Sequence, residues 1–168
     1  HHRSSAASDV YKRQELAGVF KNIIAIASGM VSGLNMGENA RAMLLTRGLG
    51  ENIKLSRALG ATTRSFLGIA GIGDLIATCS SKLSRNYRVG YGLAQKRSLD
   101  DILEELGEVA EGVNTIKLAK GLSLHYQKHE FPIIEALYQV LCENRDLRAA
   151  VGELMLHDLD IDADFMDF

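Results

Sequence analysis

The sequence predicts an all-α protein built as a single multi-helix domain. Apolar residues recur at helical spacing along most of the chain, and no stretch alternates apolar and polar residues as a half-buried strand does. Capping residues also stand where the apolar periods begin and end. With 168 residues, 46% of them hydrophobic and 24% charged, the chain is large and apolar enough for one domain with a real core.

The first predicted helix covers 15–31 and stops near Gly33. Its recurring apolar residues are Leu16, Val19, Phe20, Ile23, Ile24, Ala27, Met30 and Val31. The apolar run is about long enough to span a bilayer, but Lys21 and Asn22 interrupt it, and a charge inside a membrane is costly. We therefore favour a buried amphipathic helix over a membrane span.

The middle of the chain adds short elements around a group of glycines. The predicted elements are a helix over 39–59 with Gly60 as its stop, a short helix capped by Thr62 or Thr63, a glycine corner at Gly68, Gly71 and Gly73, and a short helix after Asp74. The G-x-x-G-x-G order follows a helix rather than a strand, so it does not match a dinucleotide-binding turn. We expect the corner to permit close backbone packing and to fix the direction of Asp74 and Thr78.

The second half of the domain has clearer capping residues. It predicts a helix from Ser84 or Asn86 to Lys96, one over 99–106 capped by Ser98, helices over 113–126 and 131–142, and a last helix to about Leu156 capped by Asp146. Pro132 suits a helix start, where its missing amide costs no hydrogen bond.

Both ends of the chain differ from this helical pattern. Residues 1–14, HHRSSAASDVYKRQ, have no apolar period and look like a non-native leader. Residues 157–168 contain five aspartates and are expected to form a loosely held acidic tail. The helical domain is therefore assigned to 15–156.

Charge and cysteine content exclude several function classes. The 19 basic and 21 acidic residues give no excess of positive charge for nucleic acid or an anionic membrane. Cys79 and Cys142 lack metal-ligand spacing and are too few for a disulfide framework, and the histidines do not pair with them. We expect no metal site and a cytoplasmic location.

Two groups of residues have the chemistry of a binding site. Lys21 either lays its stem along the core edge with its ammonium in water, or is a functional lysine whose pKa is lowered by burial, and Asn22 beside it faces the same choice. At a helix start, the sequence Ser-Arg-Asn over 84–86 suits a phosphate, or is an exposed cap with a solvated arginine. Glu111, before a glycine, is more typical of a helix cap than of a ligand contact.

Three segments together resemble a known family. ELAGVFKNIIAIASGMVSGLNMGENARAMLLTRGL, GIAGIGDLIATCSSKLSRNYRVG and EVAEGVNT are similar, in order and spacing, to the C-terminal domain of bacterial-type NAD(P)-dependent sn-glycerol-3-phosphate dehydrogenases. The resemblance runs from Glu15 to about Met155. It implies a helical bundle like the C-terminal domain of 6-phosphogluconate dehydrogenase. It also implies a parent enzyme that interconverts glycerol 3-phosphate and dihydroxyacetone phosphate for phospholipid synthesis.

The resemblance also implies a role for each candidate residue. Lys21 matches the catalytic lysine, which accepts the proton of the C2 hydroxyl in oxidation and donates it in reduction. The other matches are Asn22, Asp74 and Thr78 around the substrate hydroxyls, Ser84, Arg85 and Asn86 in the substrate-binding group, and Arg85 and Glu111 at the cofactor.

The family's N-terminal Rossmann domain, which mainly binds NAD or NADP, has no counterpart in this sequence. We therefore expect the chain alone to bind cofactor weakly and to turn over negligibly. A homodimer is one arrangement that would cover apolar helical faces. The alternatives are a non-catalytic helical dimerisation or interaction module and the substrate domain of a related NAD(P)-dependent dehydrogenase.

Overall fold

The computed structural model describes residues 18, 20–58, 69–107, 110–126 and 130–156, and all regular structure within them is helical, which confirms the all-α prediction. We call the first helix, described over 20–33, the central helix. It is followed by α2 (Gly37–Ala58), the π-helical turn η2 (Ile69–Gly73), α3 (Asp74–Ser80), α4 (Arg85–Ala94), α5 (Leu99–Leu106), α6 (Glu111–His125), α7 (Pro132–Cys142) and α8 (Leu147–Leu156). The predicted leader, the Thr62 or Thr63 cap and the acidic tail lie outside the described residues.

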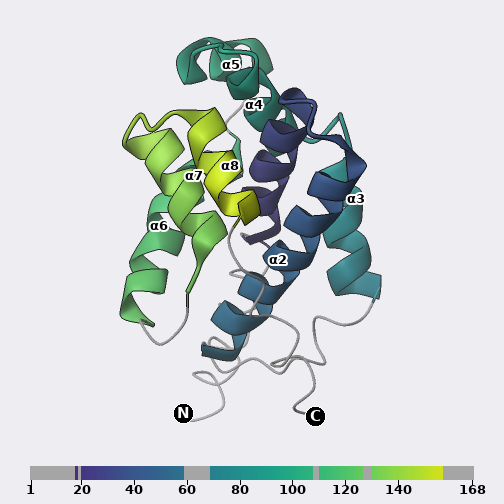
Figure 1. Cartoon of the computed structure of the whole chain (residues 1–168), viewed down its shortest axis with the longest axis vertical. Coiled ribbons are helices and arrows are strands. Elements are labelled where there is room, and N and C mark those ends of the chain that lie inside the picture. Colours follow the sequence, from purple (N-terminus) through teal and green to yellow (C-terminus); the bar gives the residue numbers. More distant parts are fainter. Residues whose placement is uncertain (1–17, 19, 59–68, 108–109, 127–129, 157–168) are drawn as a thin grey trace, which may run out of the picture.

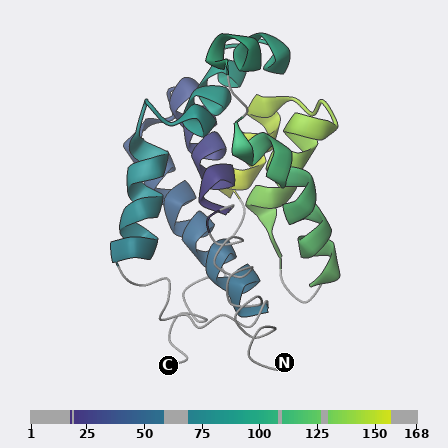
Figure 2. The same cartoon turned by 180° about the vertical axis from the view of Figure 1, so that it is seen from behind.

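The central helix is surrounded by the other helices. It runs between α2 and α3 on one side and α6, α7 and α8 on the other, with α4 and α5 at one end of the bundle (Figures 1 and 2). Every residue from 22 to 31 is buried. The prediction of a buried helix is confirmed, but the helix is covered on more faces than an amphipathic pattern implies, because α2, α4 and the helices opposite pack around it. Among the helices of the described part, none combines the length and apolar character needed to cross a bilayer.

Side-chain caps fix several helix starts as the sequence predicts. The Ser98 hydroxyl accepts the Asp101 amide at 3.1 Å, and the Asp146 carboxylate accepts the Ala149 amide at 2.8 Å. Pro132 is the first residue of α7, where no intrahelical amide is required. These caps act over three residues, so the local sequence is enough to set them.

Glycines bring the central helix and α4 into backbone contact. A Cβ atom at Gly90 would lie 1.8 Å from the carbonyl oxygen of Ile26, and one at Gly29 would lie 2.0 Å from that of Tyr87. Gly33 likewise faces Ala94. Gln95, just after α4, donates its Nε2 to the Gly33 carbonyl oxygen at 2.8 Å, and near the helix starts Asn22 and Asn86 both lie next to Gly112, so the two helices run in the same general direction. The residues at their starts, 21–22 and 85–86, therefore lie toward the same end of this contact.

Two glycines of the predicted corner, Gly71 and Gly73, lie on a helical path, and the third, Gly68, lies outside the described residues. Residues 69–73 form the turn η2, and Gly73 has right-handed helical angles, φ −62° and ψ −44°. The chain therefore passes from η2 into α3 without leaving a helical path, and Asp74 is the first residue of α3. Glycine permits a tight corner but does not require one, and here the helical path continues through it.

A buried carboxylate links α2 to α7. Glu51, on α2, accepts the backbone amides of Ile133 at 2.7 Å and Ile134 at 3.4 Å. Burial is the main reason that the pKa of Glu51 rises from 4.5 to about 8, against the lowering effect of these amides and of the charges of Lys54 and Arg47. The carboxylate supplies the start of α7 with the acceptor that its N-cap residue, Phe131, lacks.

Candidate functional site

The residues predicted to form a site lie at or near the starts of four helical elements. Lys21 and Asn22 are near the start of the described central helix, Asp74 is the first residue of α3, Arg85 and Asn86 begin α4, and Glu111 begins α6. Hydrogen bonds or ion pairs join most of these segments directly. The fold thus assembles one cluster from segments up to 89 residues apart in the chain.

Lys21 and Asp74 form an ion pair. The lysine Nζ lies 2.6 Å from Asp74 Oδ2, with the lysine side chain 32% exposed and the aspartate 49% exposed. Phe20 before Lys21 and the turn that follows it are buried, so the lysine stem leaves the core and its ammonium meets the carboxylate near the surface. The stem of Lys21 at the core edge fits the first of the two interpretations, and its ammonium is paired with the Asp74 carboxylate.

Two buried asparagines attach the start of α6 to this cluster. Asn22 Nδ2 donates to Glu111 Oε2 at 2.9 Å, and Asn86 Oδ1 accepts the Gly112 amide at 3.0 Å. Asn22 and Asn86 are 8% and 7% exposed, so neither amide is a surface group. A buried amide group is stable only when it is hydrogen-bonded, and each of these is bonded to the start of α6.

Gly112 leaves room for this arrangement. A Cβ atom there would lie 2.8–2.9 Å from the Ile26 side chain, the Asn22 carbonyl oxygen and Asn86 Oδ1. Any side chain at this position would push α6 away from the central helix and from α4. The sequence prediction missed this role because a single glycine near a helix start does not indicate which helices approach it.

The Ser-Arg-Asn group is divided between structural and exposed positions. Ser84 is the N-cap of α4, and its hydroxyl accepts the Tyr87 amide at 3.4 Å, as the cap interpretation predicts. Arg85 is exposed at the start of the same helix, whereas Asn86 is buried. Of these three consecutive residues, the first therefore caps the helix, the second lies at the surface and the third lies in the interior.

Thr78 and Glu111 complete the predicted set. Thr78 is half-buried one turn after Asp74, which places both on one face of α3. Among the described contacts, no hydrogen bond joins Thr78 to Lys21. Glu111 is not the N-cap of α6, because Ala110 holds that position; it lies in the first turn and accepts from Asn22. The cap interpretation of Glu111 is therefore wrong in detail.

Ser28 is a further positioning contact that the sequence prediction missed. Its buried hydroxyl donates to the carbonyl oxygen of Cys79 at 2.8 Å and so holds α3, which carries Asp74, against the central helix. The Cys79 thiol beside it is buried, and burial, with the charge of Asp74, raises its pKa to about 12. A thiol with that pKa stays protonated at neutral pH and is not a nucleophile.

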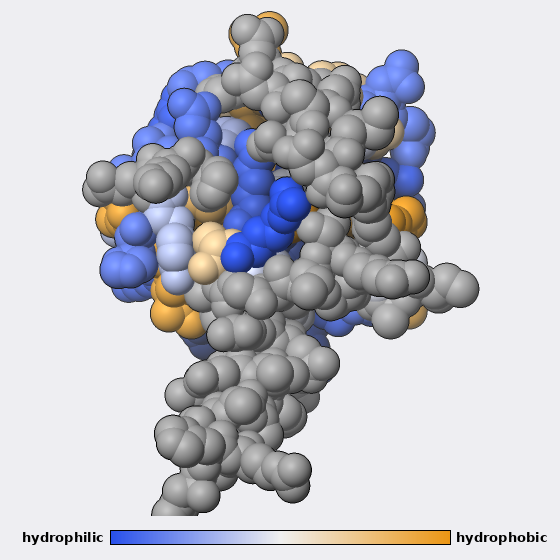
Figure 3. All heavy atoms as spheres, turned by 90° about the horizontal axis from the view of Figure 1, so that it is seen from below, coloured by the Kyte–Doolittle hydropathy of each residue, from blue (hydrophilic) through white to orange (hydrophobic). Residues whose placement is uncertain are grey.

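The electrostatics of the cluster are balanced. Lys21 and Arg85 oppose Asp74 and Glu111, so the four side chains carry no net formal charge. The starts of α4 and α6 add backbone amides and the positive ends of two helix dipoles. An anion would therefore find its favourable contacts at Arg85 and the helix starts. Seen from below, hydrophilic side chains gather near the middle of the described surface and apolar ones form patches toward its rim (Figure 3).

No group of three His, Cys, Asp or Glu side chains within the described residues is arranged to hold a metal ion. The cluster itself presents an amine, two amides and two carboxylates. A lysine paired with a carboxylate can give or take a proton. The two buried asparagines can hold the surrounding groups in position.

Comparison with known proteins agrees with this arrangement. A family model described as NAD-dependent glycerol-3-phosphate dehydrogenase C-terminus matches residues 12–152. The chain belongs to this family. The resemblance predicted from the three sequence segments is confirmed.

Individual dehydrogenases match the chain at high identity. The glycerol-3-phosphate dehydrogenase [NAD(P)+] of Ectopseudomonas mendocina is 47% identical over 152 residues, which are 90% of this chain and 44% of the relative. The enzyme of the same name from Staphylococcus saprophyticus is 51% identical over 141 residues, 84% of this chain and 42% of the relative. The chain thus spans less than half the length of these dehydrogenases.

A solved structure shows the same fold. The crystal structure of glycerol-3-phosphate dehydrogenase from Coxiella burnetii superposes with a TM-score of 0.81 at 36% identity, covering 85% of this chain and 44% of that one. The helical arrangement described here is therefore that of the C-terminal part of the dehydrogenase family.

Proposed function

We propose that this chain is the substrate-binding and proton-transferring domain of an NAD(P)-dependent glycerol-3-phosphate dehydrogenase. The observation that carries the proposal is the ion pair of Lys21 and Asp74, held beside the cluster of Asn22, Asn86 and Glu111. Family membership supports the same assignment. The substrate pair is sn-glycerol 3-phosphate and dihydroxyacetone phosphate.

In this proposal Lys21 handles the proton of the C2 oxygen. Its ammonium donates a proton as the ketone of dihydroxyacetone phosphate is reduced, and its amine accepts the proton of the C2 hydroxyl in the reverse direction. Asp74 holds the Lys21 Nζ in place at 2.6 Å. Ser28 acts indirectly, because its bond to Cys79 holds the helix that carries Asp74.

The remaining residues orient the substrate. Arg85, exposed at the start of α4, supplies charge and parallel donors for the phosphate. Asn22 and Asn86 border the C2 region, with Thr78 and Ser84 at the edges of the site. Binding the phosphate away from the reacting carbon positions that carbon for transfer.

NAD or NADP supplies the hydride acceptor or donor of this reaction when bound. The described residues contain no strand and hence no parallel-sheet dinucleotide fold. Arg85 and Glu111, at adjacent helix starts, are the residues of this chain that we assign to the cofactor. The chain alone is therefore expected to turn over negligibly, with the main cofactor site on a partner domain. The two cysteines, too few for a disulfide framework, support the cytoplasmic location, and the resemblance supports the supply of phospholipid synthesis.

The catalytic role is tested in a chimera. Residues 20–156 replace the matching part of the Ectopseudomonas mendocina dehydrogenase, and NAD(P)H oxidation is followed with dihydroxyacetone phosphate. Lys21→Met should lower kcat by about 10³-fold, within the usual contribution of general acid–base catalysis, with circular dichroism unchanged. Lys117→Met, at an exposed lysine of α6, is the matched control and should retain the rate of the chimera.

Substrate binding is tested in the chain itself. Glycerol 3-phosphate should shift amide resonances of residues 84–86 and 111–112, and Arg85→Gln should weaken this binding while Arg148→Gln, an exposed arginine on α8, should not. A chimera that keeps its rate without Lys21, or a chain whose shifts do not depend on Arg85, would contradict the proposal. Both results together would favour a non-catalytic helical module.

A further inference from the structure

A pocket lies between α4 and α5, and the proposed reaction uses none of the residues that line it. It has a volume of about 470 Å³. Its lining residues are Lys82, Tyr87, Arg88, Tyr91, Gly92, Gln95, Arg97, Ile102, Glu105 and Leu106. None of them belongs to the cluster around Lys21 and Asp74. The lining carries three basic side chains and one acidic one, so it favours an anionic occupant.

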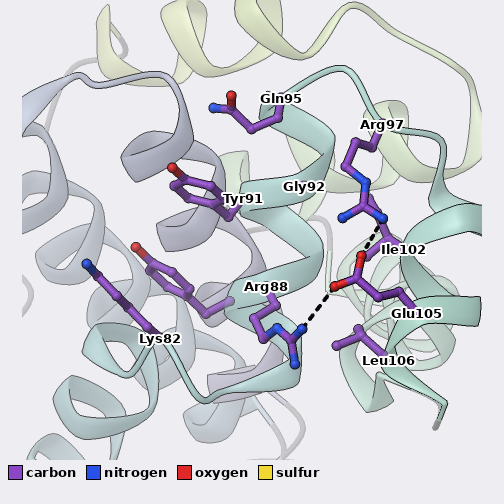
Figure 4. Close-up of a pocket in the computed structure, with 10 residues that line it drawn as sticks. Lys82, Arg88, Tyr91, Gly92, Gln95, Arg97, Ile102, Glu105 and Leu106 are labelled. Atoms are coloured by element: carbon purple, nitrogen blue, oxygen red, sulfur yellow. Dashed lines mark hydrogen bonds and ion pairs between the residues drawn. The ribbon is translucent and has the colours of Figure 1, made fainter.

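Two arginines of this pocket converge on one carboxylate. Arg88 Nη2 lies 3.2 Å from Glu105 Oε1, and Arg97 Nη2 lies 2.5 Å from Glu105 Oε2. Figure 4 shows the two guanidinium groups pointing at Glu105 from opposite sides, with Ile102 and Leu106 next to it. The hydrogen bond from Arg97 is the main reason that the pKa of Glu105 lies below its usual range. The carboxylate is thus a built-in anion between two cations.

The ion pairs are held near the surface. Arg88, Arg97 and Glu105 have side chains that are 47%, 43% and 50% exposed. Pairs with this exposure contribute little to stability and exchange readily with other ions. A ligand with two negative charges would satisfy both guanidinium groups better than the single charge of Glu105 does.

An apolar and aromatic surface adjoins the two arginines. Gly92 has no side chain, and a Cβ atom there would lie 2.7 Å from Ile102 Cδ1, so α5 lies directly against α4 at this point. Three residues along α4 from Arg88, Tyr91 is 45% exposed, and its ring stacks on that of Tyr87, with 6.3 Å between centroids and 18° between planes. This surface accepts a flat apolar group and offers little to a small polyol.

We propose that the α4–α5 pocket binds a phosphate monoester with an aromatic body. The phosphate takes the place of the Glu105 carboxylate between Arg88 and Arg97, and the aromatic body extends past Arg88 toward Tyr91, its neighbour three residues along α4. Glycerol 3-phosphate has the phosphate but lacks the body, so this ligand is distinct from the proposed substrate. Glu105 is then a competitor whose displacement accompanies binding.

Phenyl phosphate titrated into the ¹⁵N-labelled chain tests the proposal. The amide resonances of Gly92, Gln95 and residues 102–106 should shift, with inorganic phosphate binding more weakly and phenol not binding. The double variant Arg88→Gln/Arg97→Gln should weaken phenyl phosphate by at least about tenfold, as loss of a charge-assisted contact does. Arg148→Gln, an exposed arginine on α8, is the matched control and should leave the affinity unchanged.

Glu105→Gln gives an independent test with the opposite sign. Removal of the competing charge should tighten phenyl phosphate by about tenfold, whereas Glu104→Gln, an exposed neighbour on the same helix, should change it little. Tyr91→Ala should weaken phenyl phosphate severalfold and leave inorganic phosphate unaffected. The proposal is overturned if Glu105→Gln does not tighten binding, or if the shifts appear at residues 84–86 and 111–112 instead.

Discussion

The starts of α6 and α7 both have backbone amides that are hydrogen-bonded by a side chain of another helix, but the two side chains differ. Neither helix has a side-chain cap at its own N-cap residue, Ala110 or Phe131. On α6 the Gly112 amide donates to the neutral side chain of Asn86. On α7 the amides of Ile133 and Ile134 donate to the buried carboxyl group of Glu51. The neutral cap lies in the candidate site, and the ionisable cap lies away from it.

This difference has consequences for pH. Asn86 does not titrate, so the start of α6 keeps its acceptor at every pH. The pKa of Glu51 rises to about 8, mainly through burial, so its protonated form is favoured in the folded chain. The start of α7 is therefore the more pH-sensitive of the two. Of the contacts that hold the candidate site together, the bond between Asn86 and the Gly112 amide is one that does not depend on pH.

The largest expected difference between the starts of α6 and α7 is the pH dependence that Glu51 gives to the free energy of unfolding. Its folded pKa, about 8, is above the ordinary 4.5, so its contribution to stability is complete below about pH 4.5 and is lost as pH rises through 8. The loss is up to about 1.4 kcal/mol per pH unit within this window, about 5 kcal/mol in all. The free energy of unfolding, from urea denaturation at pH 5 to 8.5, measures it.

The reference for this measurement is Glu51→Gln, which resembles the protonated carboxyl at every pH. The variant should match the unsubstituted chain at pH 5 and exceed it in stability by several kcal/mol at pH 8.5, by the linkage above. Glu104→Gln, an exposed carboxylate on α5, controls for a change of charge alone. If the stability difference between Glu51→Gln and the unsubstituted chain is the same at every pH, a raised pKa of Glu51 is contradicted.

The next largest effect is the loss of the Glu51 acceptor itself. Glu51→Ala at pH 5 should lower the free energy of unfolding by about 3 kcal/mol, because two buried amides, those of Ile133 and Ile134, lose their acceptor and a cavity opens. At pH 8.5 the loss should be much smaller, because the carboxylate then costs free energy to bury. A loss below about 1 kcal/mol at pH 5 would show that α7 does not depend on this contact.

The same comparison shows how far the sequence predicts the fold. The Ser84, Ser98 and Asp146 caps were predictable because donor and acceptor lie three residues apart, within one turn. Glu51 was not, because its partners lie 82 and 83 residues away and only tertiary packing brings them together. Helix existence therefore follows from periodicity and local caps. The polar contacts between helices do not.

The candidate site, like the fold, could be predicted from the sequence only in part, because its contacts join segments that are far apart in the chain. Residue chemistry left Lys21 open between a core-edge and a functional role, and only the family resemblance connected it with Asp74, 53 residues away. The start of α6 was predicted two residues too late, at Val113, because the bond from the Gly112 amide to Asn86 is invisible to local patterns. The resemblance supplied the set of residues, and the structure supplied the contacts between them.

Of the effects expected at the starts of α6 and α7, the smallest is that of Asn86, which lies in the site. Asn86→Ala should lower the free energy of unfolding by about 2 kcal/mol, because one buried amide loses its acceptor and a small cavity forms. Ser98→Ala, which removes a local cap at an exposed start, should cost about 1 kcal/mol. Urea denaturation at pH 7 compares the two variants directly.

The two variants should differ more in what they do to the site than in stability. Without Asn86, the Gly112 amide should lose protection from hydrogen exchange, and the affinity for glycerol 3-phosphate should fall. Ser98→Ala should change neither, since α5 contributes no residue to the cluster. If Asn86→Ala lowers stability but leaves both the exchange at Gly112 and the affinity unchanged, the start of α6 is held by its packing against Ile26 and Asn22, and Asn86 is no more than a buried cap.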